Sequence, residues 1–139
     1  MYIEDTKEVR CVKRLVKASK QDIEGMSRIG YSGHLEIYIN TNDAGKIPHF
    51  HIRQKDDWQS FHSCVRIDKP EYFLHAGKED VLNAKQKREL QEFMSSPVTL
   101  SRYADKFTNN WELACFLWDI NNSDVEIGLD VEQPDYTLL

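Results

Sequence analysis

Long hydrophobic runs are missing from this chain of 139 residues. No apolar stretch approaches the roughly 20 residues that a membrane-spanning helix needs. The first residues, Met1–Asp5, are acidic where a secretory signal peptide would be basic and then apolar. A cytoplasmic location without a membrane partner is therefore expected. The three cysteines, Cys11, Cys64 and Cys115, are odd in number and far apart, which argues against a disulfide framework and against a cysteine-rich zinc site.

Positive charge is missing from the end of the chain, because no lysine or arginine follows Lys106. The formal net charge is −5, which does not favour general nucleic-acid binding. Cations gather instead in residues 7–20, and acidic residues gather in residues 123–139. These two segments could pair within one copy or between two copies of the chain. A solvated, charged helix face is the simpler interpretation of the basic segment.

The length fits a single domain over residues 1–139, and a hydrophobic content of 40% is ordinary for a globular protein. The expected parts are an N-terminal extension (residues 1–32), a core (residues 33–122) and an acidic tail (residues 123–139). The extension should contain an amphipathic helix over Glu8–Lys20 and, because of Gly25 and Gly30, an irregular connection over Gln21–Ser32. The tail should contain one short strand over Val125–Val131.

Alternation of apolar and polar residues predicts four strands in the core. They are His34–Asn40, Pro48–Gln54, Phe61–Asp68 and Glu71–His75. Turn residues separate them at short, regular intervals, which is typical of an antiparallel meander.

Two helices should follow the strands. Asn83 and Gln86 have the spacing of a capping box, and Pro97 stops that helix. Thr108 or Asn109 can cap a second helix that is apolar on more than one side. The predicted fold class is therefore α+β: an antiparallel sheet of about four strands with helices packed on one face.

The pleat of a strand sends successive side chains to opposite faces, so the faces can be assigned by parity. If the apolar sets of all four strands face the helices, the other face carries the remaining residues. This predicted binding face, called here the histidine face, consists of His34, Glu36, Tyr38, His49, His51, Arg53, His62, Cys64, Arg66 and His75. All five histidines of the chain would lie on it.

A tight turn within Lys55–Trp58 would place His51 opposite His62 and His49 opposite Cys64. Directly opposed residues have Cβ atoms roughly 4.5–5.5 Å apart, within reach of a shared ligand. His49 and His51, with His62 or Cys64, are then candidates for a metal site or an acid–base cluster, since imidazole and thiolate suit zinc, iron or copper.

Other interpretations of the histidine face stay open. It can be the polar side of a half-exposed sheet, with Cys64 a free thiol. It can also hold an anion through Arg53 and Arg66. Cys64 beside His49 would be a nucleophile–base pair. No catalytic residue, metal or cofactor is assigned from sequence; His49, His51 and His62 are the candidates for either role, and a divalent transition metal is the cofactor that would fit them.

The order of these motifs resembles the bacterial domain-of-unknown-function family 4160. The resemblance covers about Gly33 to Asn122 and rests on three runs: Leu35 to Arg53 with Pro48-His49-Phe50-His51, then Val65-Arg66-Ile67-Asp68, then Asn110-Trp111-Glu112-Leu113-Ala114. Ile47 departs from it by replacing the first of two prolines. The positions carried over are Pro48, His49, His51 and Trp111.

The resemblance implies a small cytoplasmic α+β domain. The genes of the family often lie beside another small gene, in an arrangement similar to toxin–antitoxin pairs, which implies a protein partner from a neighbouring gene. We therefore expect a ligand- or protein-binding module that uses the histidine face, within a toxin–antitoxin-like or defence-related pair, or as a homo-oligomer. The alternative is a metal- or histidine-dependent hydrolase or nuclease centred on His49, His51 and His62.

Overall fold

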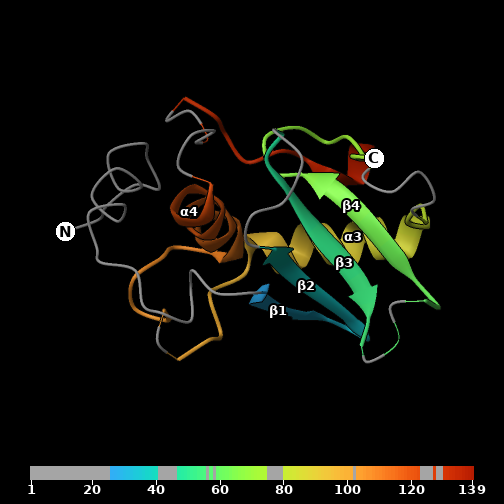
Figure 1. The fold of residues 1–139 in the computed structure, drawn as a ribbon, viewed down its shortest axis with the longest axis horizontal. Coiled ribbons are helices and arrows are strands. Elements are labelled where there is room, and N and C mark those ends of the chain that lie inside the picture. Colours follow the sequence, from blue (N-terminus) through green and yellow to red (C-terminus); the bar gives the residue numbers. More distant parts are fainter. Residues whose placement is uncertain are drawn as a thin grey trace.

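The computed structural model describes residues 26–40, 47–55, 57, 59–74, 80–101, 103–122, 127 and 130–139. The elements are β1 (Met26–Ser32), β2 (Leu35–Asn40), β3 (His49–Gln54), β4 (His62–Arg66), α3 (Ala84–Ser95), α4 (Asn110–Asn121) and the short 3-10 helix η2 (Tyr136–Leu138). The strands form one antiparallel sheet in the order β1-β2-β3-β4 (Figure 1), so the predicted α+β class with a four-stranded meander is confirmed. The helix expected over Glu8–Lys20 lies outside the described residues.

Both described α-helices begin at predicted caps, the first at Asn83 and the second at Asn109, one of the two residues expected there. Asn83 forms the capping box with Gln86, through a 2.8 Å and a 2.9 Å hydrogen bond that satisfy two backbone N–H groups at the helix start. Asn109 caps α4 by accepting a hydrogen bond of 2.9 Å from the backbone N–H of Glu112.

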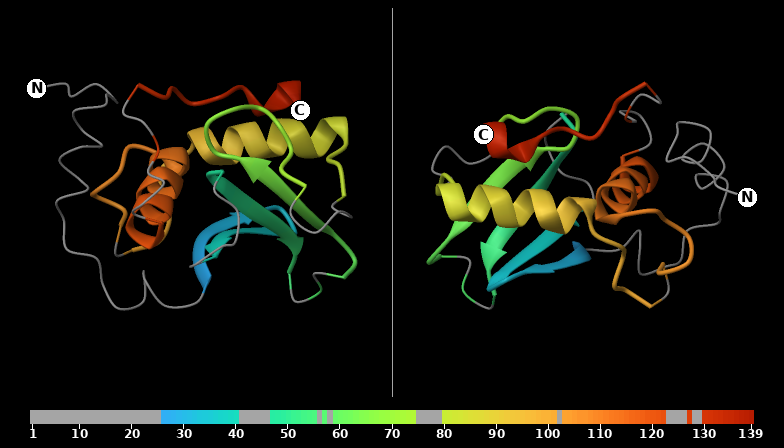
Figure 2. Two further views of the ribbon diagram at one scale, coloured as in Figure 1. Left: turned by 45° about the horizontal axis from the view of Figure 1, so that its top comes forward. Right: turned by 180° about the vertical axis from the view of Figure 1, so that it is seen from behind.

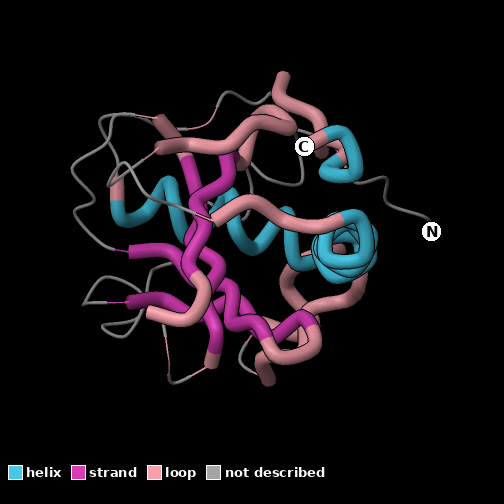
Figure 3. Tube along the Cα trace, turned by 90° about the vertical axis from the view of Figure 1, so that its right-hand side faces the viewer, coloured by secondary structure: helices cyan, strands magenta, loops and turns pink. Residues whose placement is uncertain are grey.

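The two helices cover different parts of the sheet. Helix α3 lies across one face, in front of the strands when the molecule is viewed from behind (Figure 2), and buries Leu90 and Met94 there. Helix α4 lies beside the sheet at the end where β2 stops and β3 starts (Figure 1), and Figure 3 shows it crossing that end. Every residue of α4 from Asn110 to Asp119 is buried, which explains why its sequence is apolar on more than one side. No helix among the described residues has the length and apolar character to cross a membrane.

Strand β1 corrects the prediction that Gln21–Ser32 is irregular, because residues 26–32 pair with β2. Gly30 suggested a break, but it has a packing role in the strand. A Cβ built on Gly30 would lie 2.9 Å from Cζ of Phe93 on α3. The missing side chain therefore lets the helix approach the sheet closely.

The predicted strand Glu71–His75 is also wrong. Of its described residues, Tyr72 alone makes a β-bridge, to Val65, and His75 lies outside the described residues. The segment nevertheless runs along the outer edge of β4, through hydrogen bonds from Arg66 N to Glu71 O and from Phe73 N to Cys64 O, each 2.9 Å.

The C-terminal segment is part of the core. The carbonyl oxygen of Ile67 accepts hydrogen bonds from Nε1 of Trp111 at 2.9 Å and from the hydroxyl of Tyr136 at 3.0 Å. Tyr136 is fully buried, and its burial raises the pKa of its phenol well above the usual value. Of the expected strand Val125–Val131, the described residues 127, 130 and 131 are not in a strand.

Replacing Gly30 by alanine should destabilise the fold by about 1–3 kcal/mol, because the new methyl group collides with Phe93. Urea unfolding would measure the loss. Shortening the neighbour in the double variant Gly30→Ala/Phe93→Leu should recover part of it. If the double variant lost as much stability as the single variants Gly30→Ala and Phe93→Leu lose together, the contact would be contradicted.

Replacing Tyr136 by phenylalanine should cost about 1 kcal/mol near neutral pH, since one hydrogen bond to Ile67 is lost. The raised pKa of Tyr136 adds a second expectation. The unfolded phenol ionises near pH 10 and the folded one only above it, so its contribution is present below pH 10 and is lost as pH rises. Unfolding at about pH 8 and about pH 11 should show a steeper loss for the native chain than for Tyr136→Phe. The exposed Tyr31→Phe is the control, and an equal alkaline loss in Tyr136→Phe would refute the assignment.

Candidate metal centre

The pleat brings polar residues of three strands together on the sheet face opposite α3. Tyr38 on β2 pairs with His51 on β3, and His51 pairs with Cys64 on β4. Glu36 pairs with Arg53 in the same way. These side chains therefore lie on one face, because paired residues of neighbouring strands point to the same side of a sheet.

The predicted pairing of β3 with β4 is wrong by two residues. His51 lies opposite Cys64, not His62, and His49 lies opposite Arg66. The connection is longer than a tight turn, since Gln54 N donates to the carbonyl of Phe61 and closes a wider loop. A shift of two residues keeps every side chain on its face, so the grouping survives while the partners change.

Two described members of the predicted histidine face, His34 and Arg66, do not join this cluster. His34 lies in the turn between β1 and β2 and is exposed, and His75 lies outside the described residues. Arg66 is held by two 2.9 Å hydrogen bonds to Asp68, which raise the pKa of its guanidinium. Its charge is therefore already compensated within β4 and the chain that follows.

The face is covered at its centre, so the half-exposed sheet surface is a wrong description for these residues. His49 and Cys64 are fully buried, and His51 is 2% exposed. The rings of Phe73 and Trp118 lie 4.4 Å and 5.4 Å from the ring of His49. Helix α4 thus reaches this face through Trp118.

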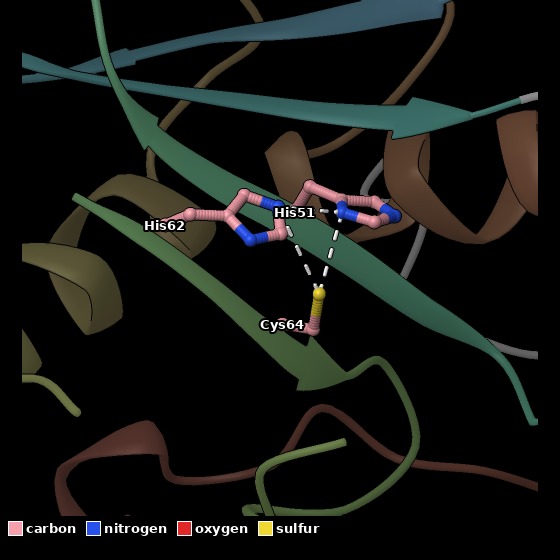
Figure 4. A group of neighbouring side chains, drawn as sticks. All are labelled: His51, His62 and Cys64. Carbon is pink, nitrogen blue, oxygen red and sulfur yellow. Dashed lines mark hydrogen bonds between the residues drawn. The ribbon is translucent and has the colours of Figure 1, made fainter. Parts of the chain in front are cut away.

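Three possible ligand atoms converge beside this covered centre. Nδ1 of His51 lies 3.1 Å from Nε2 of His62, and Sγ of Cys64 lies 3.3 Å and 4.0 Å from these two nitrogens (Figure 4). All three atoms lie within 4.8 Å of one another. His62 is half-buried, so the cluster meets solvent on its side.

The triangle has the size that a bound ion requires. The point in their plane that is equidistant from its corners is about 2.1 Å from each atom, against about 2.0–2.1 Å for Zn–N and about 2.3 Å for Zn–S bonds. A tetrahedral ion would lie slightly above this plane, at slightly longer distances. Imidazole and thiolate are the ligands that zinc and related transition metals prefer. Three protein ligands leave one tetrahedral position open.

Further contacts fix the two imidazoles. Nε2 of His51 lies 3.4 Å from the side-chain amide of Asn40, and the Tyr38 ring stacks on His51 at 5.0 Å. If the amide of Asn40 is flipped, its oxygen faces Nε2 of His51. A carbonyl oxygen is a usual acceptor for the second ring N–H of a metal-bound histidine. Asp80 accepts a 2.9 Å hydrogen bond from the backbone N–H of His62 and returns one of 2.7 Å to its carbonyl. The prediction missed both residues. Asn40 ends the alternating run His34–Asn40 with the parity of Tyr38, so parity could have indicated it, whereas Asp80 lies in no such run.

His49 is not a member of the convergent set, which corrects its place among the candidates. Its Nδ1 lies 2.7 Å from the carbonyl oxygen of Ile47, and its ring packs against Trp118 and Phe73. The expected pair of Cys64 with His49 is replaced by Cys64 with His51. His49 therefore supports the site from the core.

An ion pair borders the cluster. Nε of Arg53 donates to Oε1 of Glu36 at 2.6 Å, and the guanidinium carbon lies 4.8 Å from the centre of the Tyr38 ring. Glu36 is buried, and Arg28 approaches its other oxygen at 3.7 Å. The site thus has a fixed cation beside its imidazoles.

Comparison of the chain with protein-family models, with curated proteins and with solved structures gives no match. Membership of family 4160 stays a prediction from the sequence motifs.

Replacing His49 by alanine should destabilise the protein by about 2–5 kcal/mol, because it empties a packed position next to Trp118. His62→Ala should cost less, since His62 is half-buried. Urea unfolding in the presence of a chelator would separate this packing role from any effect of a metal. Equal stability losses for the two variants would mean that His49 does not act as a core residue.

Proposed function

We propose that this domain binds a divalent transition metal of the zinc class through His51, His62 and Cys64. The observation that carries the proposal is the convergence of the three ligand atoms within 4.8 Å. Their separations of 3.1, 3.3 and 4.0 Å lie within about 0.4 Å of the edges of a tetrahedral site, which are about 3.4 Å between nitrogens and about 3.6 Å between nitrogen and sulfur. The proposal narrows the binding module expected from sequence to one kind of ligand.

The position of the three ligand residues supports metal binding. They come from two paired strands of a covered sheet, so little conformational freedom is left to lose on binding. A thiolate and two neutral imidazoles would leave a bound divalent ion with one net positive charge. The partly exposed His62 leaves a way for an ion and for a fourth ligand to enter.

Metal-dependent hydrolysis is the second candidate function. It is favoured by the count of three protein ligands, which is typical of catalytic zinc sites, whereas structural sites have four. A bound metal would supply a Lewis acid and an activated water at the open position. In this form the hydrolase expected from sequence uses Cys64 in place of His49.

A protein partner from a neighbouring gene, or a second copy of the chain, stays a prediction from sequence. It would be compatible with metal binding, because the charged terminal segments that suggested it are separate in sequence from the cluster.

Zinc binding should be measured on chelator-treated protein whose purification tag contains no histidine. We expect one zinc per chain by elemental analysis, with a stabilisation of about 2.7 kcal/mol when free zinc is at one hundred times the dissociation constant. Cys64→Ser and His62→Ala should each weaken binding by at least about tenfold, since each removes one of three ligands.

Matched controls are available in the same chain. Cys115 is another buried cysteine, in α4, and His34 is an exposed histidine in a turn. Cys115→Ser and His34→Ala should bind zinc as the native chain does. Native affinity in Cys64→Ser, or no stoichiometric zinc in the native chain, would refute the proposal.

A further inference from the structure

Arg53 is a preorganised cation next to the proposed metal. Its Nε donates to Glu36 at 2.6 Å, and its guanidinium carbon lies over the Tyr38 ring, 4.8 Å from the ring centre. In the part of the chain that the structure describes, the two terminal amino groups of Arg53 have no hydrogen-bond partner. The side chain is 26% exposed, so these groups can be reached by a ligand.

The guanidinium is close to the cluster. Arg53 is the direct cross-strand partner of His62, and such partners have Cβ atoms about 4.5–5.5 Å apart. Tyr38 also contacts both Arg53 and the cluster, since its ring centre lies 4.8 Å from the Arg53 guanidinium carbon and 5.0 Å from the centre of the His51 ring. An ion at the cluster and the free end of Arg53 therefore border the same space.

We infer that the ligand of this site carries a phosphoryl group, bound by the metal and by Arg53 together; the inference rests on the proposed metal function. One phosphoryl oxygen would occupy the open metal position, and two others would accept hydrogen bonds from the terminal amino groups. Such a bridge spans about 6–7 Å from metal to guanidinium nitrogen, given a metal–oxygen bond of about 2 Å and hydrogen bonds of about 2.9 Å.

The number of oxygens favours phosphate over carboxylate. A carboxylate has two oxygens, and a paired contact with arginine uses both. A phosphoryl group keeps a third oxygen for the metal. The planar fork of arginine matches two phosphoryl oxygens, and here contacts with Glu36 and Tyr38 already hold the side chain, so less side-chain entropy remains to be lost.

The same argument separates Arg53 from Arg66. Both lie on this face, but Arg66 has two hydrogen bonds to Asp68 and a further contact of 3.5 Å with Glu71. Its charge is compensated by two carboxylates. Arg53 has one carboxylate partner, and only its Nε is engaged by it.

The test uses the full chain loaded with Co²⁺, whose spectrum reports its ligands, and titrates inorganic phosphate. Arg53→Gln alone would leave the buried Glu36 without its main partner, so the informative pair is Glu36→Gln and the double variant Glu36→Gln/Arg53→Gln. Phosphate should shift the cobalt spectrum in the native chain and in Glu36→Gln. The double variant should bind phosphate about 10- to 100-fold more weakly, while its cobalt affinity is unchanged.

Further arms identify the ligand class. Arg66→Gln should bind phosphate as the native chain does, and acetate at the same concentration should bind more weakly than phosphate. A phosphomonoester such as phenyl phosphate should compete with inorganic phosphate. Failure of the ester to compete would mean that the site takes free phosphate and no phosphate esters.

The outcomes separate the two proposals. If cobalt binds but Glu36→Gln and the double variant bind phosphate equally well, the phosphoryl inference is overturned and metal binding is left intact. The same holds if cobalt binds but acetate binds more tightly than phosphate. Failure of cobalt and zinc to bind the native chain overturns both.

Discussion

The carbonyl oxygen of Ile67 holds three parts of the molecule in one arrangement. It follows directly after β4, and it accepts hydrogen bonds from Trp111 on α4 and from Tyr136 near the C-terminus. These contacts fix the buried helix against the end of the sheet, and that helix carries the Trp118 ring that packs on His49. The geometry of the candidate metal centre therefore depends on a hydrogen-bond acceptor outside it, because the covered face would open if α4 moved away.

Parity was the part of the site that sequence could predict. A strand alternates its faces whatever its partner, so the common face of His51 and Cys64 follows from their place in two apolar-alternating runs. Register was not predictable in the same way. It depends on the loop between β3 and β4, and a loop closed between Gln54 and Phe61 differs from a tight turn by two residues. That difference replaced His49 by Cys64 in the cluster, although both residues were already candidates.

The errors in the predicted fold have one cause, because local sequence patterns carry no information about tertiary contacts. Gly30 indicated a loop because glycine weakens isolated strands, but here its missing side chain makes room for Phe93. Alternation in Glu71–His75 indicated a strand, although its described residues share only one β-bridge with β4. The caps at Asn83 and Asn109 were predicted well, since capping needs only residues within one turn.

The outer edge of β4 has a further consequence, for association between molecules. Glu71, Phe73 and Asp80 together engage backbone groups of Arg66, Cys64 and His62 on that edge, so the strand presents few unpaired groups on which another chain could add a strand. Exposed strand edges template aggregation, and covering them with a loop is one way that proteins prevent it. The segment from Glu71 to Phe73, which is not a strand, thus covers the outer edge of β4. It keeps β4, with two of the three candidate ligand residues, from pairing with the edge of another sheet.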